Sequence, residues 1–273
     1  MDLELGLLHA RLERPQTRKF AWPIAIIPEL FTTFRHLTIM AGHLVSLGWE
    51  VYLLDIHAAS SRRFPASDAR ATAFSTFLQN AQDALGNIGS PIVVAGHGLG
   101  GLLALKLAEA PSVRAAVALA PLIPGVSTPL LRRRHWMRLG RSNATTLPVR
   151  RRIIDFVSDA EPFQRESLIK ALIPADPSAA MEVADGIIKF GAEQTPRLVI
   201  AGEADLFAPF QEAARFAAEI KAQFLSLPGC GHWLIGGRAL ERTIAHMQRF
   251  LVKASGEELL LLYEQLNFDA GDQ

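Results

Sequence analysis

Three short motifs, far apart along the chain, carry residues suited to acid–base or nucleophilic chemistry. Residues 96–101 read Gly-His-Gly-Leu-Gly-Gly, residues 202–205 end on Asp205, and residues 228–233 contain His232. An aspartate that orients a histidine makes the imidazole a general base, and such a base commonly activates a nucleophile. At the centre of the first motif stands Gly98, which has no side chain with which to attack a substrate.

The glycine-rich motif follows an apolar run at residues 92–95 and precedes an apolar helical pattern. Small residues are required where a strand turns sharply into a helix, and the first amides of that helix, beginning with Leu99, can hold a developing oxyanion. The same glycines match a dinucleotide-binding fingerprint. They follow the third predicted strand rather than the first, and the next strand ends without an acidic residue, so that interpretation is set aside.

The order of these motifs along residues 22–252 resembles that of the α/β-hydrolase family, with nucleophile turn, acid loop and histidine loop in succession. The resemblance implies a three-layer α/β fold, with a mostly parallel central sheet, helices on both faces and an inserted helical cap. It also implies that Asp205 and His232 are catalytic and that position 98 belongs to the nucleophile. The alternative to a catalytic role is that the aspartate and histidine are no longer used in catalysis and only form a hydrogen bond between their loops.

Two positions depart from the family pattern. Gly98 replaces the serine and leaves space above the turn for a water or a ligand atom. The loop after the first parallel strand reads Pro28-Glu29-Leu30-Phe31, where the family usually has His-Gly and then an amide donor. Leu30 or Phe31 can still supply that amide, but Glu29 brings a carboxylate close to where negative charge would form. Glu29 is either a surface carboxylate or a second acid–base group at the pocket mouth.

Three hypotheses for function follow. The first is an enzyme without a serine nucleophile, in which the His232–Asp205 dyad is a general base on a small hydrophobic carbonyl compound, with an anionic group as an option. Lyase, isomerase and water-activating hydrolase reactions fit this description. The second is a non-catalytic protein that binds a ligand or partner on a hydrolase scaffold. The third is an ordinary serine hydrolase whose nucleophile has been replaced by Gly98.

Apolar runs that alternate with helical patterns predict the mostly parallel sheet. A core formed by residues 1–121 and 196–273 is expected, with residues 122–195 inserted as the cap. The predicted strands are residues 23–27, 50–55, 92–95, 115–119, 197–201 and 222–227, with an antiparallel pair within residues 8–20. The predicted helices are residues 33–47, which end at Gly48, and residues 69–85, 99–110 and 209–220.

Other side chains near the motifs have a structural and a functional interpretation. His97 is expected to pack behind the turn, with a catalytic role as the alternative. Trp233 follows His232 and is expected to line the pocket. Cys230 is expected to be a packing residue, and His57 follows a strand end that could line the site.

Composition narrows the classes of partner and compartment. A net charge of +1 argues against nucleic acid, and the longest apolar runs are too short for a membrane span. The sequence has a single cysteine and no cluster of histidines and carboxylates at ligand spacing, so we expect no metal and no cofactor. The single cysteine and an N-terminus unlike a signal peptide both fit a cytoplasmic location.

Eight arginines lie within residues 132–152, and they form either a solvated face or an anion-attracting pocket mouth. A C-terminal amphipathic helix containing Leu259, Leu262 and Leu266 is expected to dock on the core, with a homodimer contact as the alternative.

Overall fold

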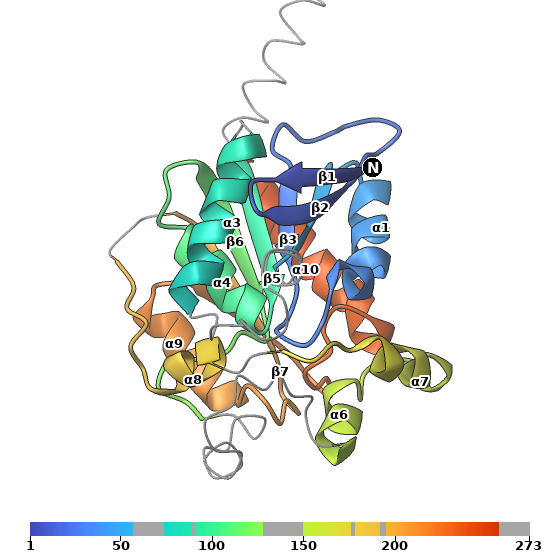
Figure 1. Cartoon of the computed structure of the whole chain (residues 1–273), viewed down its shortest axis with the longest axis vertical. Helices are drawn as coiled ribbons and strands as arrows, with labels where there is room; N and C mark the ends of the chain where they lie inside the picture. The colour runs from blue at the N-terminus through green and yellow to red at the C-terminus, as the bar shows by residue number, and fades with distance from the viewer. Residues whose placement is uncertain (57–73, 89–90, 128–149, 176–177, 192–194, 257–273) are drawn as a thin grey trace, which may run out of the picture.

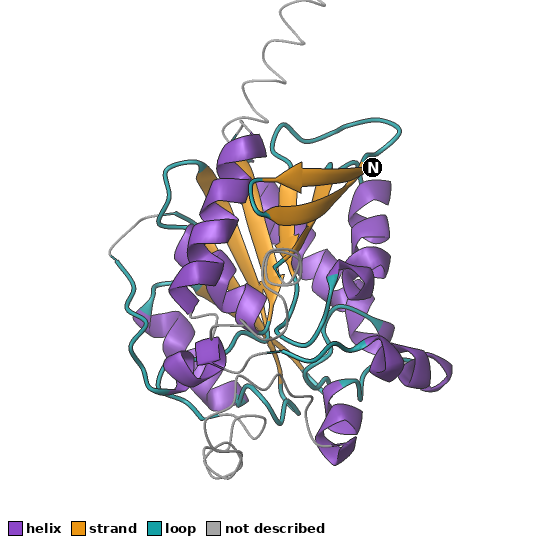
Figure 2. Ribbon diagram, in the orientation of Figure 1, coloured by secondary structure: helices purple, strands orange, loops and turns teal. Residues whose placement is uncertain are grey.

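The central feature of the computed structural model is an eight-stranded sheet (Figures 1 and 2). The structure describes residues 1–56, 74–88, 91–127, 150–175, 178–191 and 195–256. The strands lie in the order β1-β2-β4-β3-β5-β6-β7-β8. Only the pairs β1–β2 and β2–β4 are antiparallel. The strands of the sheet span these residues: β1 Asp2–Leu5, β2 Leu8–Glu13, β3 Ile24–Ile27, β4 Val51–Asp55, β5 Ile92–His97, β6 Val113–Leu119, β7 Arg197–Gly202 and β8 Gln223–Leu227.

Helices cover both faces of this sheet, as Figure 1 shows. On one side lie α3 (Phe74–Ile88) and α4 (Leu99–Leu107), and on the other lie α1 (Thr38–Ser46) and α10 (Leu240–Ala254). The helix α9 packs against β7 and β8 near the sheet edge. The described helices are η1 Phe34–Leu37, α1 Thr38–Ser46, α3 Phe74–Ile88, α4 Leu99–Leu107, α6 Arg150–Phe156, α7 Pro162–Ala171, α8 Ser178–Ala184, α9 Phe210–Glu219, η3 Gly237–Ala239 and α10 Leu240–Ala254.

The central strands are mostly apolar because helices bury both of their faces. Every residue of β3, β5 and β7 is buried. The strand order reverses between β3 and β5, which pair in parallel with Ile27 beside Gly96. At such a switch point the carboxyl ends of neighbouring strands open a crevice where ligands bind. The residues that follow β3 and β5 therefore meet at this place.

The expected fold class is confirmed, and the parallel strands lie where the apolar runs predict them. The antiparallel pair expected within residues 8–20 lies only partly there, because residues 8–13 form a strand and residues 14–20 do not. It is formed by residues 2–5 and 8–13, around a turn at Gly6 with a φ of 64°, and β2 rather than a later segment carries the pairing to β4. The helix predicted at residues 69–85 extends to Ile88, and its expected first residues lie outside the described part. Gly48, with a φ of 105°, ends the first helical segment as expected.

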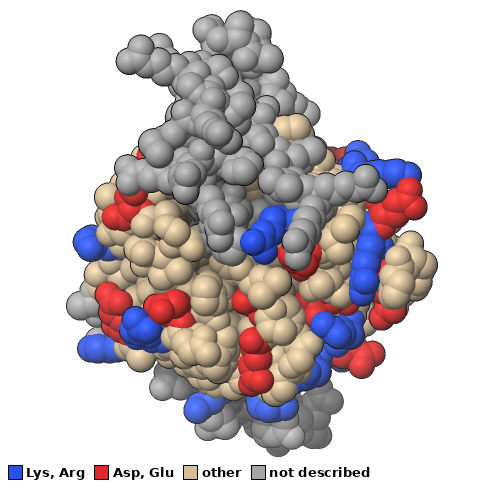
Figure 3. All heavy atoms as spheres, turned by 90° about the horizontal axis from the view of Figure 1, so that it is seen from below, with Lys and Arg blue, Asp and Glu red and all other residues tan. Residues whose placement is uncertain are grey.

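The segment between β6 and β7 contains the described helices α6, α7 and α8. Of the eight arginines, those at 132–141 lie outside the described residues, and Arg152 pairs with Asp155 at 3.6 Å. The C-terminal residues 257–273 and His57 also lie outside. On the face seen in Figure 3, acidic and basic side chains are interspersed. Within the described residues, no helix has the length and hydropathy needed to cross a bilayer.

Candidate active site

The turn at Gly98 joins β5 to α4 in a conformation that suits glycine. Its φ is 53° and its ψ is −115°, and a φ in this range strains any residue with a Cβ. The Gly98 carbonyl accepts the amides of Leu102 and Leu122, and its own amide donates to Leu119. Behind the turn, a Cβ on Gly100 would lie 2.3 Å from the carbonyl oxygen of Ile27. Tight backbone packing therefore holds the turn against the end of β3.

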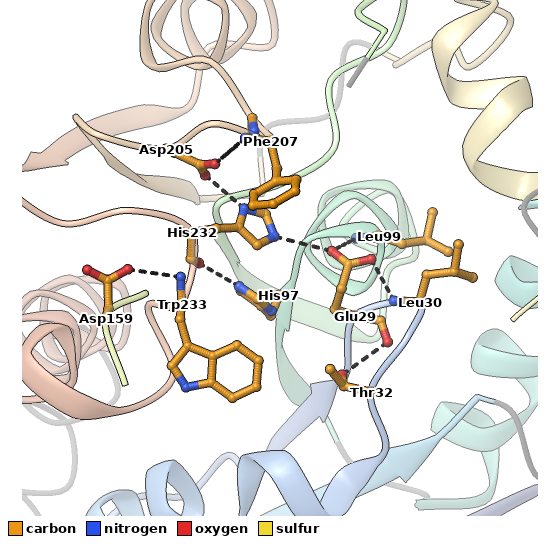
Figure 4. Close-up of polar contacts among 11 residues, drawn as sticks. Glu29, Leu30, Thr32, His97, Leu99, Asp159, Asp205, Phe207, His232 and Trp233 are labelled. Atoms are coloured by element: carbon orange, nitrogen blue, oxygen red, sulfur yellow. Dashed lines mark hydrogen bonds and ion pairs between the residues drawn. The ribbon is translucent and has the colours of Figure 1, made fainter. Parts of the chain in front are cut away.

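Glu29 fills the space directly above this turn (Figure 4). Its side chain is buried, and one carboxylate oxygen accepts the amide of Leu30 at 2.6 Å while the other accepts the amide of Leu99 at 3.0 Å. These are two of the amides expected to form an oxyanion hole. A Cβ built on Gly98 would lie 1.0 Å from Glu29 Oε2. The interpretation of Glu29 as a surface carboxylate is therefore wrong, and the expected space for a water or ligand is occupied by its carboxylate.

Asp205 and His232 meet at the carboxyl ends of β7 and β8. Asp205 Oδ2 lies 2.8 Å from His232 Nδ1, and Asp205 Oδ1 accepts the amides of Phe207 and Ala208. Both side chains are buried. The aspartate is thus fixed by its own loop and, in turn, fixes the ring of His232.

On its other side, the His232 ring faces Glu29. His232 Nε2 lies 3.7 Å from Glu29 Oε2, which is an ion-pair distance but too long for a hydrogen bond. Nε2 has no hydrogen-bond partner among the described residues. Burial alone would lower the pKa of His232, but the charge and hydrogen bond of Asp205, followed by Glu29, outweigh it and raise the pKa to about 10. His232 is therefore a cation at neutral pH, held between two carboxylates.

His97 lies behind the turn, with Nε2 2.8 Å from the carbonyl oxygen of His232. Burial, together with the charge of His232, lowers the pKa of His97 to about 4, so its ring is neutral. Its ring centroid is 4.7 Å from that of His232 and 5.9 Å from that of Trp233. His97 thus supports the histidine loop from beneath.

The family model for "Alpha/beta hydrolase family" matches residues 19–245, which is most of the chain. The chain belongs to the α/β-hydrolase family. A comparison with curated proteins found no match.

Solved α/β-hydrolase-like structures superpose on nearly the whole chain. A monoacylglycerol lipase from Paleococcus ferrophilus is 18% identical with a TM-score of 0.69, covering 91% of this chain and 99% of its own. A thermophilic esterase from Thermogutta terrifontis is 18% identical with a TM-score of 0.66, covering 90% and 94%. A methylesterase from Arabidopsis is 14% identical with a TM-score of 0.67, covering 85% and 99%. At these identities the likeness establishes the fold.

Within this α/β-hydrolase scaffold, a further site residue is Asp159, which lies just after α6 and belongs to none of the sequence motifs. Its carboxylate is buried and accepts the amides of Gly231 and Trp233, the residues on either side of His232. Arg238 donates to the same carboxylate through Nε and Nη2. Asp159 therefore ties the inserted segment to the histidine loop. A lone aspartate after an arginine-rich stretch gave no sequence signal for this role.

Aromatic rings that the motifs did not reveal surround the imidazole. Phe156 and Phe207 have ring centroids 5.1 Å and 5.2 Å from that of His232, and both are buried. Trp233 is buried beside them, 5.5 Å from Phe156. The surroundings of His232 are thus apolar apart from the two carboxylates and His97.

Three further predicted positions play smaller parts. Phe31 is buried, and its carbonyl accepts the amide of Ile173 from the inserted segment. Cys230 is buried, as expected of a packing residue, with Arg242 Nη1 3.6 Å from its sulfur. Leu99 contributes its backbone amide to Glu29, while its side chain is buried.

Glu29, His97 and His232 each offer a ligand atom within 4.8 Å of the others, the arrangement most similar to a metal site in the described residues. Both Glu29 oxygens are already hydrogen-bonded, and a metal would have to displace the His232 proton. The arrangement favours a proton over a metal ion at this place.

Proposed function

We propose that this α/β-hydrolase-family protein is an enzyme that moves protons on a small hydrophobic carbonyl compound without forming an acyl-enzyme. In this proposal, Glu29 is the base and the His232 cation is the acid. The observation that carries it is the 3.7 Å separation between Glu29 Oε2 and His232 Nε2, whose proton has no hydrogen-bond partner among the described residues. Neighbouring groups in opposite protonation states form an acid–base pair.

The chemistry follows from that pair. The substrate carbonyl oxygen accepts the Nε2 proton of His232, while Glu29 removes a proton from the carbon next to the carbonyl. The product of this step is an enol, with Glu29 protonated and His232 neutral. When Glu29 returns its proton to a different carbon and the enol O–H returns its proton to His232 Nε2, the substrate is isomerised. When a β-substituent instead leaves with the proton held by Glu29, the enol O–H again returns its proton to His232 and an unsaturated carbonyl compound remains. Asp205 keeps the ring oriented throughout.

This assignment revises the expected general base. A histidine whose pKa is raised to about 10 already carries its proton at neutral pH, so it cannot accept another. The base role passes to Glu29, and the Asp205–His232 dyad becomes the proton donor. The reason is electrostatic, because two carboxylates face one buried imidazole.

The substrate is proposed to be neutral and largely apolar around the carbonyl. Phe156, Phe207 and Trp233 provide an apolar surrounding for His232. Two carboxylates and one imidazolium give the site a net negative charge, which disfavours an anionic group beside it. The anionic alternative depended on the arginines, most of which lie outside the described residues.

Hydrogen exchange in D₂O tests the proposal directly. The probes are 2-tetralone and phenylacetaldehyde, whose α-protons are followed by NMR. The wild type should accelerate deuterium incorporation, and Glu29→Gln should lower the rate by about 100-fold or more, as expected when a general base is lost. Glu182→Gln is a matched control, because Glu182 also binds a backbone amide, that of Phe74, but outside the site. Exchange that persists in Glu29→Gln would contradict the proposal.

A non-catalytic binding protein is the second candidate. It is favoured by the internal pairing of both oxyanion-hole amides with Glu29 and by the burial of Glu29 and His232. For this candidate, a probe ketone should bind to the wild type and to Glu29→Gln with equal affinity and emerge unexchanged. Any exchange that depends on the protein would eliminate it.

A further inference from the structure

A pocket of about 680 Å³ is lined by none of the residues described at the proposed active site. It is bordered by α9 and the residues just after it, the residues after α8 and the loop after β6. Arg197, the first residue of β7, lines it, whereas Asp205 follows the last residue of that strand. The rise of a strand places these two ends about 15–20 Å apart. Arg197 is therefore at the opposite end of β7 from the loop that carries Asp205.

Arg197 is a buried guanidinium that forms no ion pair with another described residue. The residue is only 4% exposed, and neither Nε nor Nη2 has a hydrogen-bond partner among the described residues. Nη1 lies 3.5 Å from the carbonyl oxygen of Ile220, at the end of α9. This contact is at the outer limit of hydrogen-bond length. Within the part of the chain that the structure describes, one long contact is thus the hydrogen bonding that this guanidinium has.

The acidic groups of the pocket do not compensate this charge. Glu212 and Glu219 line the pocket, but the Glu212 carboxylate pairs with Arg215 at 3.0 Å, and Glu219 is an exposed residue. Neither forms an ion pair with Arg197 among the described residues. Proteins bury a charge only at considerable cost unless it is paired, so an unpaired buried guanidinium indicates a missing anion.

The rest of the lining indicates what accompanies the anion. Phe190 and Phe216 form an edge-on pair at 5.4 Å, with Ile188 also on the wall. Lys189 and Lys221 are exposed residues at the same pocket. The wall thus combines a buried guanidinium, exposed lysines and an apolar surface. A guanidinium binds carboxylate and phosphate oxygens through two parallel hydrogen bonds.

We infer that this pocket is a binding site for an amphiphilic anion, in which a carboxylate or phosphate group pairs with Arg197 and an apolar chain lies against Phe190 and Phe216. The site is independent of Glu29 and His232. Bound at α9, it would stabilise the edge of the sheet formed by β7 and β8.

Calorimetric titration with octanoate and octyl phosphate tests this inference. Octanol, which has the apolar chain without the anionic group, and inorganic phosphate, which has the anionic group without the chain, are the control ligands. One or both amphiphilic anions should bind more tightly than octanol and phosphate. Arg197→Met should weaken that binding by about 10- to 100-fold, as expected for lost hydrogen bonds to a charged group. Arg114→Met, at an exposed arginine on β6 outside the pocket, is the matched control and should bind as the wild type does.

Arg197→Lys keeps the charge but loses the two-pronged geometry, so it should bind with intermediate affinity, and it replaces the methionine variant if that one does not fold. A rise in melting temperature with octanoate in the wild type, absent in the Arg197 variants, would support the site independently. Equal affinity in wild type and both Arg197 variants, or no saturable binding of either amphiphile, would overturn the inference.

Discussion

At the scale of single residues, Gly98 and Glu29 form one unit. The carboxylate of Glu29 lies where a side chain at position 98 would begin, and it binds both Leu30 and Leu99 amides. A serine at position 98 and a carboxylate in this place exclude each other. The two departures from the family pattern therefore have one physical explanation, since the glycine makes room for the glutamate.

Restoring the serine alone should not restore ester hydrolysis. In Gly98→Ser, the new Cβ displaces the Glu29 carboxylate. The serine must also adopt the positive φ of position 98, and this backbone strain costs about 1–3 kcal/mol. We expect no turnover of p-nitrophenyl acetate and no labelling by a fluorophosphonate probe. The double variant Gly98→Ser with Glu29→Gly frees both amides and should show both activities. Ester turnover in the single variant would show that Glu29 is no obstacle.

Stability should be greatest near neutral pH and fall on either side. His232 has a folded pKa raised to about 10, so its contribution is fully present below about pH 6.5 and is lost as pH rises toward 10. His97 has a folded pKa lowered to about 4, so stability is lost as pH falls from about 6.5 toward 4. Urea unfolding from pH 4 to 10 checks this. His232→Gln should remove the alkaline loss, and a wild-type profile that is flat above pH 7 would refute the cationic state.

At the scale of elements, the site depends on loops that meet because their strands are neighbours. β3 and β5 bring Glu29 over Gly98, and β7 and β8 bring Asp205 to His232. The inserted segment adds Asp159, whose buried carboxylate binds the backbone on both sides of His232. The histidine loop is thus held from the sheet and from the insertion together.

Removing the Asp159 carboxylate should loosen this loop. Asp159→Ala leaves the amides of Gly231 and Trp233 without their acceptor, and we expect a loss of about 2–4 kcal/mol of unfolding free energy. Denaturant unfolding measures the loss. Asp155→Ala is the control, because Asp155 makes only a half-exposed pair with Arg152 and should change stability by less than about 1 kcal/mol. Similar losses in the two variants would argue against a special role for Asp159.

At the scale of the whole molecule, the antiparallel hairpin β1–β2 closes one edge of the sheet. It pairs with β4 through residues 9–13 and buries Leu8, Ala10 and Leu12. Without it, β4 would become an open edge with unpaired backbone groups and an uncovered apolar face.

Deletion of residues 1–13 should therefore cause self-association. We expect the shortened chain to elute as higher oligomers in size-exclusion chromatography at concentrations where the full chain elutes as a smaller species. The double change Arg11→Ala with Asp2→Ala, which removes the surface ion pair of the hairpin, is a milder control that keeps the edge covered. A deletion variant that elutes in the same position relative to its mass would show that β4 tolerates exposure.

Much of the fold was predictable because its signals are local. Buried parallel strands are continuous apolar runs, and Gly48 marks a helix end through its own backbone preference. The turn at Gly98 and the order of Asp205 and His232 were also legible, because each motif follows its own strand. The first strand of the hairpin could not be predicted from the sequence, since it is short and mostly exposed and has little apolar pattern.

By itself, then, the sequence determined the sheet, the turn and which residues could meet. Only the tertiary structure decided that Glu29 points inward to bind two amides and face His232. The conformation of a flexible side chain depends on the groups packed around it in the fold rather than on its neighbours in sequence. The tertiary structure likewise decided the positive charge of His232 and the contact of Asp159 with the backbone beside His232. A pKa and a buried contact depend on groups brought together from distant segments, and these distances exist only in the folded chain.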